Sequence, residues 1–259
     1  MSSHGTTLYI EGRSRLHGCH PFGKVFFILL VGVAAYFEPG NAATAATLLG
    51  LNLVLAVTGG IFPAMWKFAW RTLLPLALFM LPIHGFLYPG NHTGLLTWQG
   101  ITLYEEGLRF GGTILLQLAA ILAASLLFVF TTHPADFIAA LNKAGWPPAM
   151  AYIVGSPLLM LPAMRARTGV IKAAQQARGL DSGGNLLGRM RALPPLIAPL
   201  VLGAFTEIEE RAIALELRGF RSPGAKTSLR MVPDSTAQRV VRRAILAATG
   251  FLVLHGMVW

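Results

Sequence analysis

A chain of 259 residues could form one large or two small soluble domains, but its composition excludes that class, because apolar residues make up 54% and charged residues only 12%. The single cysteine, Cys19, excludes an intrachain disulfide and a cysteine-based metal cluster. The net charge of +10 would favour nucleic acid as the partner of a soluble protein, whereas in a membrane protein it marks the cytoplasmic loops, so no nucleic acid is expected.

Five apolar segments predict helices that cross a lipid bilayer. They are residues 22–37, 42–61, 72–87, 110–130 and 244–259. The fourth carries no charge over roughly the 20 residues that a bilayer needs. The last has 16 residues, so we expect Arg242 and Arg243 to snorkel at its start and Trp259 to anchor its end. Residues 88–107 are predicted to form a polar-to-mixed loop.

Two further apolar stretches, residues 144–164 and 192–205, lie between the fourth and last candidate spans and hold seven of the sixteen prolines. Regular spanning helices tolerate proline only where neighbouring groups satisfy the freed backbone. If both stretches crossed the membrane, the basic loop between them would lie outside, against the positive-inside bias. Kept on one side, residues 165–243 contain fourteen of the twenty-one Lys and Arg residues, which predicts that this insert is cytoplasmic.

The sequence therefore predicts an all-α polytopic membrane protein of the cell membrane, with about five transmembrane helices and an insert of long helices before the last span. The N-terminus lacks the features of a signal peptide, so it is expected to be retained and cytoplasmic. The predicted organisation is a cytoplasmic N-terminal segment (1–21), a four-helix transmembrane region (22–131), a cytoplasmic domain (132–239) and a final transmembrane helix (240–259).

Local signals place helices within the insert. Residues 149–178 predict one long, bent helix and residues 195–218 another, in which Glu207 and Arg211 have the spacing of an i,i+4 ion pair. A shorter helix before them is expected to be capped by Thr132 or His133, with Pro134 in its first turn and Asp136 at the positive end of its dipole.

An apolar group in the first long helix is a candidate surface for another membrane subunit, although packing within the chain explains each member equally well. Its members are Leu158, Met160, Leu161 and Met164.

A short motif occurs twice in the insert, forty residues apart, as Ala177-Arg178-Gly179 and Leu217-Arg218-Gly219. An arginine in the last turn of a helix faces the negative end of its dipole, and a following glycine can adopt the left-handed conformation that ends the helix. Each arginine has alanines in the helical turns before it, so the guanidinium could enter a groove of a partner and pair with a carboxylate there. They are Ala173, Ala174 and Ala177 in the first copy and Ala212 and Ala214 in the second. One copy would be an ordinary helix cap, but two copies beside apolar segments favour a binding role.

No motif predicts an enzyme, a cofactor or a metal site. Residues 219–227 approach a phosphate-binding loop, but they are one residue too long and follow a helix. His17 and His20 are three residues apart, yet further ligand candidates are missing nearby. The spans contain few polar residues, which disfavours a secondary transporter with its own substrate site.

The paired motif resembles the hallmark of one family, the transmembrane (T) component of energy-coupling factor transporters, which take up vitamins and transition metals in prokaryotes. The first copy has the family's Ala-Arg-Gly form, whereas the second has Leu217 at its first position and keeps the arginine, the glycine and the aromatic Phe220. Residues 14–24, Ser-x-Leu-His-x3-Pro-x2-Lys, also resemble the family's entry to its first span. The resemblance covers nearly the whole chain.

The resemblance implies a non-catalytic scaffold of an ABC-type transporter. Such a subunit joins two cytoplasmic ATPases to a membrane-embedded substrate-binding subunit (S component), which chooses the cargo, for example biotin, cobalt or nickel. Carried over, Arg178 and Arg218 would each occupy a groove of one ATPase and transmit nucleotide-driven motion through the long coupling helices. A self-contained permease with a polar pocket at the middle of the membrane is the alternative, and a membrane-embedded enzyme would need a cluster of catalytic residues.

Overall fold

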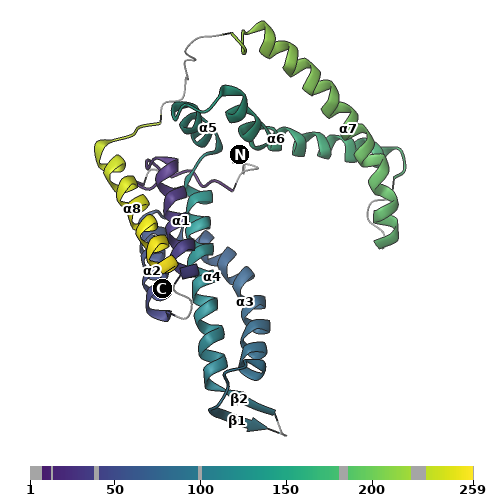
Figure 1. Ribbon diagram of the computed structural model, residues 1–259. Helices are drawn as coiled ribbons and strands as arrows, with labels where there is room; N and C mark the ends of the chain where they lie inside the picture. The colour runs from purple at the N-terminus through teal and green to yellow at the C-terminus, as the bar shows by residue number, and fades with distance from the viewer. Residues whose placement is uncertain are drawn as a thin grey trace. The chain divides into compact units, whose positions relative to one another are not determined.

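The computed structural model describes residues 8–12, 14–37, 41–98, 101–180, 186–222 and 232–258. Within these ranges it contains eight α-helices and one two-stranded antiparallel hairpin (Figure 1). The chain divides into two compact units. The bundle unit comprises residues 8–147 and 230–259, and the hairpin unit comprises residues 148–229.

The bundle unit confirms the all-α polytopic fold. Its helices are α1 (Pro21–Phe37), α2 (Ala42–Thr58), α3 (Phe62–Leu87), α4 (Glu105–Thr131), α5 (Pro134–Lys143) and α8 (Thr236–Val258). Two helices extend beyond the predicted spans, because α3 begins at Phe62 and α8 at Thr236, whereas the spans were predicted to begin at residues 72 and 244. Apolar composition marks the part of a helix suited to lipid, whereas the backbone hydrogen bonds continue into its polar turns.

By length and composition, four described helices could cross a membrane: α3, α4, residues Ala149–Ala177 of α6 and residues Met190–Leu217 of α7. The apolar helices α1 and α2 are shorter, at 17 residues each.

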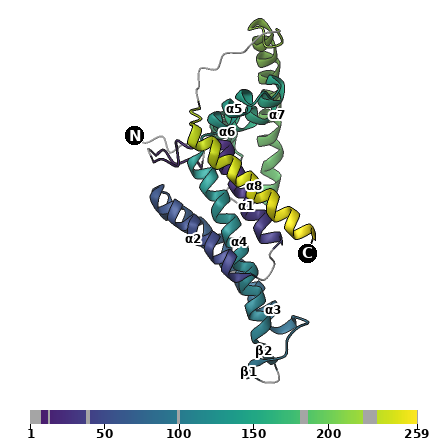
Figure 2. The same cartoon turned by 60° about the vertical axis from the view of Figure 1, so that its left-hand side comes forward.

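Helix α4 lies at the centre of the bundle unit and packs against α1, α2 and α3 (Figure 1 and Figure 2). Small residues on its buried face allow this close approach. A Cβ atom at Gly107 would collide with the carbonyl oxygen of His84 on α3, and one at Gly111 would lie 3.3 Å from the Cβ atom of His84. Further along, Ala123 packs in an apolar cluster with Ile61 and Met65, which are 1% and 2% exposed.

The segment between α3 and α4 corrects the prediction of a loop over residues 88–107. It forms β1 (Gly94–Trp98) and β2 (Ile101–Tyr104), paired from Trp98 with Ile101 to Gly94 with Tyr104 through one irregularity. Glu106 in the first turn of α4 fastens the hairpin, because its carboxylate accepts hydrogen bonds from the Thr93 amide at 3.0 Å and the Thr93 hydroxyl at 2.6 Å. The strands contain the β-branched and aromatic residues that favour pairing.

Polar contacts close the opposite end of α4. The buried Lys24 of α1 donates to the Thr131 carbonyl oxygen at 2.9 Å and to the Thr132 hydroxyl at 3.1 Å. The next residue, His133, caps α5 by accepting a hydrogen bond from the Ala135 amide at 3.1 Å. The predicted start of this helix is thereby confirmed, with His133 rather than Thr132 as the cap.

The last helix, α8, packs against α1 in both views (Figure 1 and Figure 2). Near the start of α8, the Gln238 side chain forms two hydrogen bonds with the segment before α1. It accepts one from the His20 amide at 3.1 Å and donates one to the Gly18 carbonyl oxygen at 3.3 Å. His20 is 6% exposed, and burial lowers the pKa of its imidazole below the ordinary value. Asp234 raises the pKa of His20, whereas Arg242 and Lys143 lower it further.

Candidate functional site

The hairpin unit consists of α6 (Pro148–Ala177) and α7 (Leu186–Leu217). The predicted start of the second long helix at residue 195 is wrong, because α7 begins at Leu186 and continues through Pro194, Pro195 and Pro199. Pro199 has no amide hydrogen for the carbonyl oxygen of Pro195. The Gln175 side chain of α6 donates to that oxygen at 3.2 Å instead, so the proline run is accommodated within the helix.

The first Arg-Gly motif is a complete helix terminus. Gly179 adopts the left-handed conformation, with φ +88°, directly after Arg178. Its amide donates to the Gln176 carbonyl oxygen at 3.0 Å, and the Leu180 amide donates to the Gln175 carbonyl oxygen at 3.0 Å. These two bonds are the pattern of a Schellman cap.

The second motif repeats this geometry at the end of α7. Gly219 has φ +66° and donates to the Glu216 carbonyl oxygen at 2.9 Å. The Phe220 amide donates to the Leu215 carbonyl oxygen, also at 2.9 Å. The sequence-based expectation that each motif ends a helix at a left-handed glycine is therefore confirmed, including at the copy that begins with leucine.

Both arginines of the motifs are exposed. Neither Arg178 nor Arg218 forms an ion pair with a residue that the structure describes. The preceding residues, Ala177 and Leu217, are exposed as well, and Leu217 is 84% exposed. Each helix end thus displays a cation beside a small or apolar side chain, which suits it to an acidic groove of another protein.

Helices α6 and α7 run antiparallel, and a buried carboxylate connects them. Glu207 of α7 is 9% exposed and forms an ion pair with Arg167 of α6 at 2.7 Å. It also accepts from the Nε of Arg211 at 3.0 Å, which confirms the predicted i,i+4 pair. Sequence reasoning missed Arg167, because spacing within one helix carries no information on the register between two helices.

The candidate apolar surface on α6 is partly described. Leu161 is 44% exposed, while Met160 and Met164 are half-buried, and the side chain of Leu158 lies outside the described residues. A larger exposed apolar surface lies on α7, where no sequence motif marks it. Its side chains, spaced mostly by three or four residues, belong to Met190, Leu193, Ile197, Val201, Leu202, Phe205 and Ile208.

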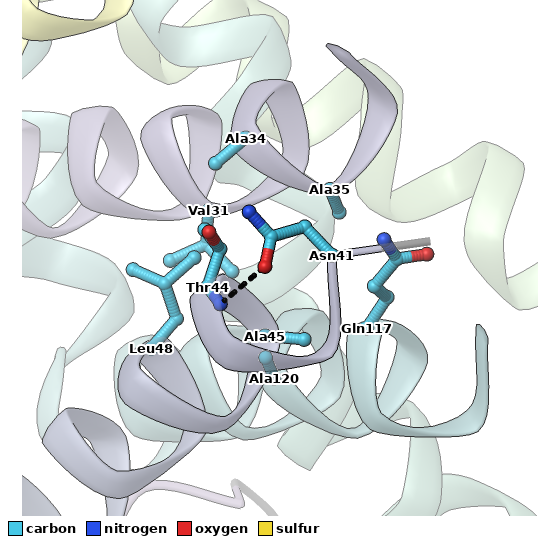
Figure 3. A pocket seen from close by; sticks show the side chains of 9 residues that line it. All are labelled: Val31, Ala34, Ala35, Asn41, Thr44, Ala45, Leu48, Gln117 and Ala120. Atoms are coloured by element: carbon cyan, nitrogen blue, oxygen red, sulfur yellow. Dashed lines mark hydrogen bonds between the residues drawn. The ribbon is translucent and has the colours of Figure 1, made fainter. Parts of the chain in front are cut away.

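One cavity between α1, α2 and α4 tests the permease alternative. Figure 3 shows its lining, where the Asn41 side chain accepts a hydrogen bond from the Thr44 amide at 3.2 Å and Gln117 is the other amide side chain. The cavity measures about 10 Å³. That volume accommodates at most one water molecule, so this mostly apolar cavity of the bundle unit is no substrate site.

The two N-terminal histidines have structural contacts. The His17 ring is hydrogen-bonded to the Ser14 hydroxyl at 2.7 Å and to the Ile10 carbonyl oxygen at 3.0 Å. His20 Nδ1 accepts from the Phe22 amide at 3.3 Å. Across the described part of the chain, no three His, Cys, Asp or Glu side chains are placed to hold a metal ion.

Comparison with known proteins covers both units. Residues 12–229 match the family CbiQ, described as cobalt transport protein. The chain is 31% identical over 230 residues to the energy-coupling factor transporter transmembrane protein EcfT of Brevibacillus brevis, covering 85% of this chain and 86% of the relative. It is 31% identical to that of Exiguobacterium sibiricum over 257 residues (95% and 96%) and 30% identical to that of Heliobacterium modesticaldum over 249 residues (92% and 91%).

Proposed function

This chain belongs to the cobalt transport protein (CbiQ) family and is the transmembrane component of an energy-coupling factor transporter, in which we propose that Arg178 and Arg218 each dock one ATPase subunit. It is a multi-pass protein of the cell membrane and is not itself an enzyme, since ATP hydrolysis belongs to partner subunits in this family. The proposed role is to pass ATP-driven motion to a membrane-embedded S component.

The observation that carries the proposal is the repeated helix terminus. Two helices end in the same Schellman cap, and each displays an exposed arginine at the cap. A capped end holds its arginine in a defined direction, which lowers the ordering cost of docking into a groove. The motif residues proposed for ATPase coupling are Ala177, Arg178, Gly179, Leu217, Arg218 and Gly219.

The geometry of the hairpin unit supports two separate docking sites. Gln175 near the end of α6 contacts Pro195 near the start of α7, while Tyr152 near the start of α6 contacts Phe220 just after α7. The two Arg-Gly ends therefore lie at opposite ends of the antiparallel pair. The 23 residues from Tyr152 to Gln175 span about 35 Å at 1.5 Å per residue, which is wide enough for each end to reach its own subunit.

Charge favours a cytoplasmic location for the hairpin unit and for the predicted domain over residues 132–239. Although α6 and α7 contain apolar segments of spanning length, α7 carries five charged residues in its last third. They are Glu207, Glu209, Glu210, Arg211 and Glu216. Inserting one charged side chain into the hydrocarbon core of the membrane costs about 2.5–3.5 kcal/mol on insertion scales. We place both helices along the cytoplasmic side, with the N-terminus on the same side.

The exposed apolar side chains of α6 and α7 support an S component as the membrane partner. The group Leu158, Met160, Leu161 and Met164 is proposed for this interface, together with the larger exposed surface of α7. The cargo is proposed to be a vitamin such as biotin, or cobalt or nickel, selected by the S component. The name of the matching family, cobalt transport protein, supports cobalt as the cargo.

Co-purification of the ATPases in mild detergent tests the docking role. Arg178→Ala combined with Arg218→Ala should leave membrane insertion intact and abolish ATPase co-purification, whereas Arg191→Ala, at another exposed arginine of α7, should not. Either docking variant alone should cost on the order of a few kcal/mol if its partner carboxylate is left buried and unpaired. Full recovery of ATPase with the double variant would refute the assignment.

A further inference from the structure

Each Arg-Gly helix end is fastened to the opposite helix of the hairpin unit. Gln175, whose carbonyl oxygen closes the first cap, donates its side chain to the Pro195 carbonyl oxygen of α7 at 3.2 Å. Phe220, whose amide closes the second cap, packs edge-on against Tyr152 of α6 with ring centroids 5.6 Å apart. Neither arginine therefore projects from a helix that is free of its neighbour.

Between these two end contacts lies the ionic group around Glu207. Arg167 reaches from α6 to the Glu207 carboxylate at 2.7 Å and donates to the Gly203 carbonyl oxygen of α7 at 3.3 Å. Arg211 holds the other carboxylate oxygen. A carboxylate that is 9% exposed is costly to bury unless cations pair with it, so removing its charge weakens the ionic contact that holds the middle of the two helices in this register.

Few apolar residues of α6 and α7 are fully buried among those that the structure describes. Among their described residues, the buried ones are Ala151, Gly155, Ala192 and Glu207. Two alanines and a glycine bury little apolar surface, and most large apolar side chains of both helices are exposed. The polar contacts between the helices therefore contribute substantially to their mutual position.

We infer that Glu207 is a positioning residue that, through Arg167, holds α6 and α7 as one body, so that displacement of either Arg-Gly end moves both helices. The origin of this displacement in ATP-driven motion of the ATPases rests on the proposed function. The rigidity of the hairpin unit is a property of this chain alone, so it can be measured without the ATPases.

Pulsed electron paramagnetic resonance on the full-length chain in lipid nanodiscs measures this rigidity. Nitroxide labels are placed at Lys172→Cys on α6 and Ile213→Cys on α7, both exposed, in a Cys19→Ser background. One narrow distance distribution is expected. Glu207→Gln, which keeps shape and removes charge, should broaden it at least twofold, and Arg167→Gln should do the same. Glu209→Gln, an exposed glutamate on the same helix, should leave it unchanged. An unaltered width in Glu207→Gln overturns the inference.

The assembled transporter provides a second readout. Glu207→Gln should retain ATPase binding within twofold while the amount of substrate delivered per ATP hydrolysed falls at least tenfold, and Glu207→Asp should recover part of the loss. Native delivery per ATP in Glu207→Gln would also overturn the positioning role. If the unmodified chain binds no ATPase at all, the proposed function fails, and the distance measurement still decides the rigidity of the hairpin unit.

Discussion

Replacing Gly179 with alanine isolates the contribution of the left-handed cap. An added Cβ atom there meets no atom of another part of the chain within 4 Å, so collision with neighbouring segments plays no part. The cost arises from the backbone, because φ +88° is unfavourable for a residue with a side chain by about 1–2 kcal/mol. That energy corresponds to a factor of about 5–30 in the equilibrium between the closed and the opened helix end.

Hydrogen–deuterium exchange of the Leu180 amide reports this opening, because that amide is bonded to Gln175 in the cap. We expect exchange in Gly179→Ala to accelerate by the same factor, and ATPase affinity to fall by no more than that factor, since docking requires the closed form. Gly179→Asn is the matched control, because asparagine tolerates the left-handed region better than alanine. Equal exchange rates in the native chain and in Gly179→Ala would refute the reasoning.

Two further substitutions test the bundle unit. Gly107→Ala should lower the thermal unfolding midpoint in detergent, because its methyl group would collide with the His84 carbonyl oxygen and overpacking costs about 1–3 kcal/mol. Gly112→Ala on the same helix should leave the midpoint unchanged, because its methyl group would meet nothing within 4 Å. Equal midpoints for the two variants would contradict the close approach of α3 and α4. Burial lowers the pKa of the His20 imidazole in the folded chain, so the unfolded chain binds a proton at this residue at higher pH than the folded chain does. The free energy of unfolding should therefore fall as the pH drops below 6.5, the ordinary pKa of histidine. His20→Asn should flatten that pH dependence, and an unchanged slope would exclude His20 as its source.

The parts of the fold that local chemistry determines could be predicted from the sequence. Pro134 and His133 set the start of α5, and the glycines at 179 and 219 set the ends of α6 and α7. These positions need only one helical turn of sequence to be recognised. The resemblance to the T component family was confirmed for the same reason, because its hallmark is a local motif.

Features that depend on contacts between distant segments could not be predicted. The prolines at the start of α7 indicated a break, but the side chain of Gln175 on another helix satisfies one freed carbonyl group. The ion pair of Arg167 with Glu207 depends on how two helices lie against each other. The hairpin of β1 and β2 contains strand-favouring residues, but Pro89-Gly90 before it and the acidic pair Glu105-Glu106 after it are equally typical of a loop.

The two hydrogen bonds between Gln238 and the segment before α1 have a consequence for biosynthesis. The two backbone partners, Gly18 and His20, leave the ribosome more than two hundred residues before Gln238 does. Until α8 has been made, the His20 amide and the Gly18 carbonyl oxygen lack this partner. A chain truncated before α8 would therefore lose the two hydrogen bonds that hold the segment before α1 against the last helix.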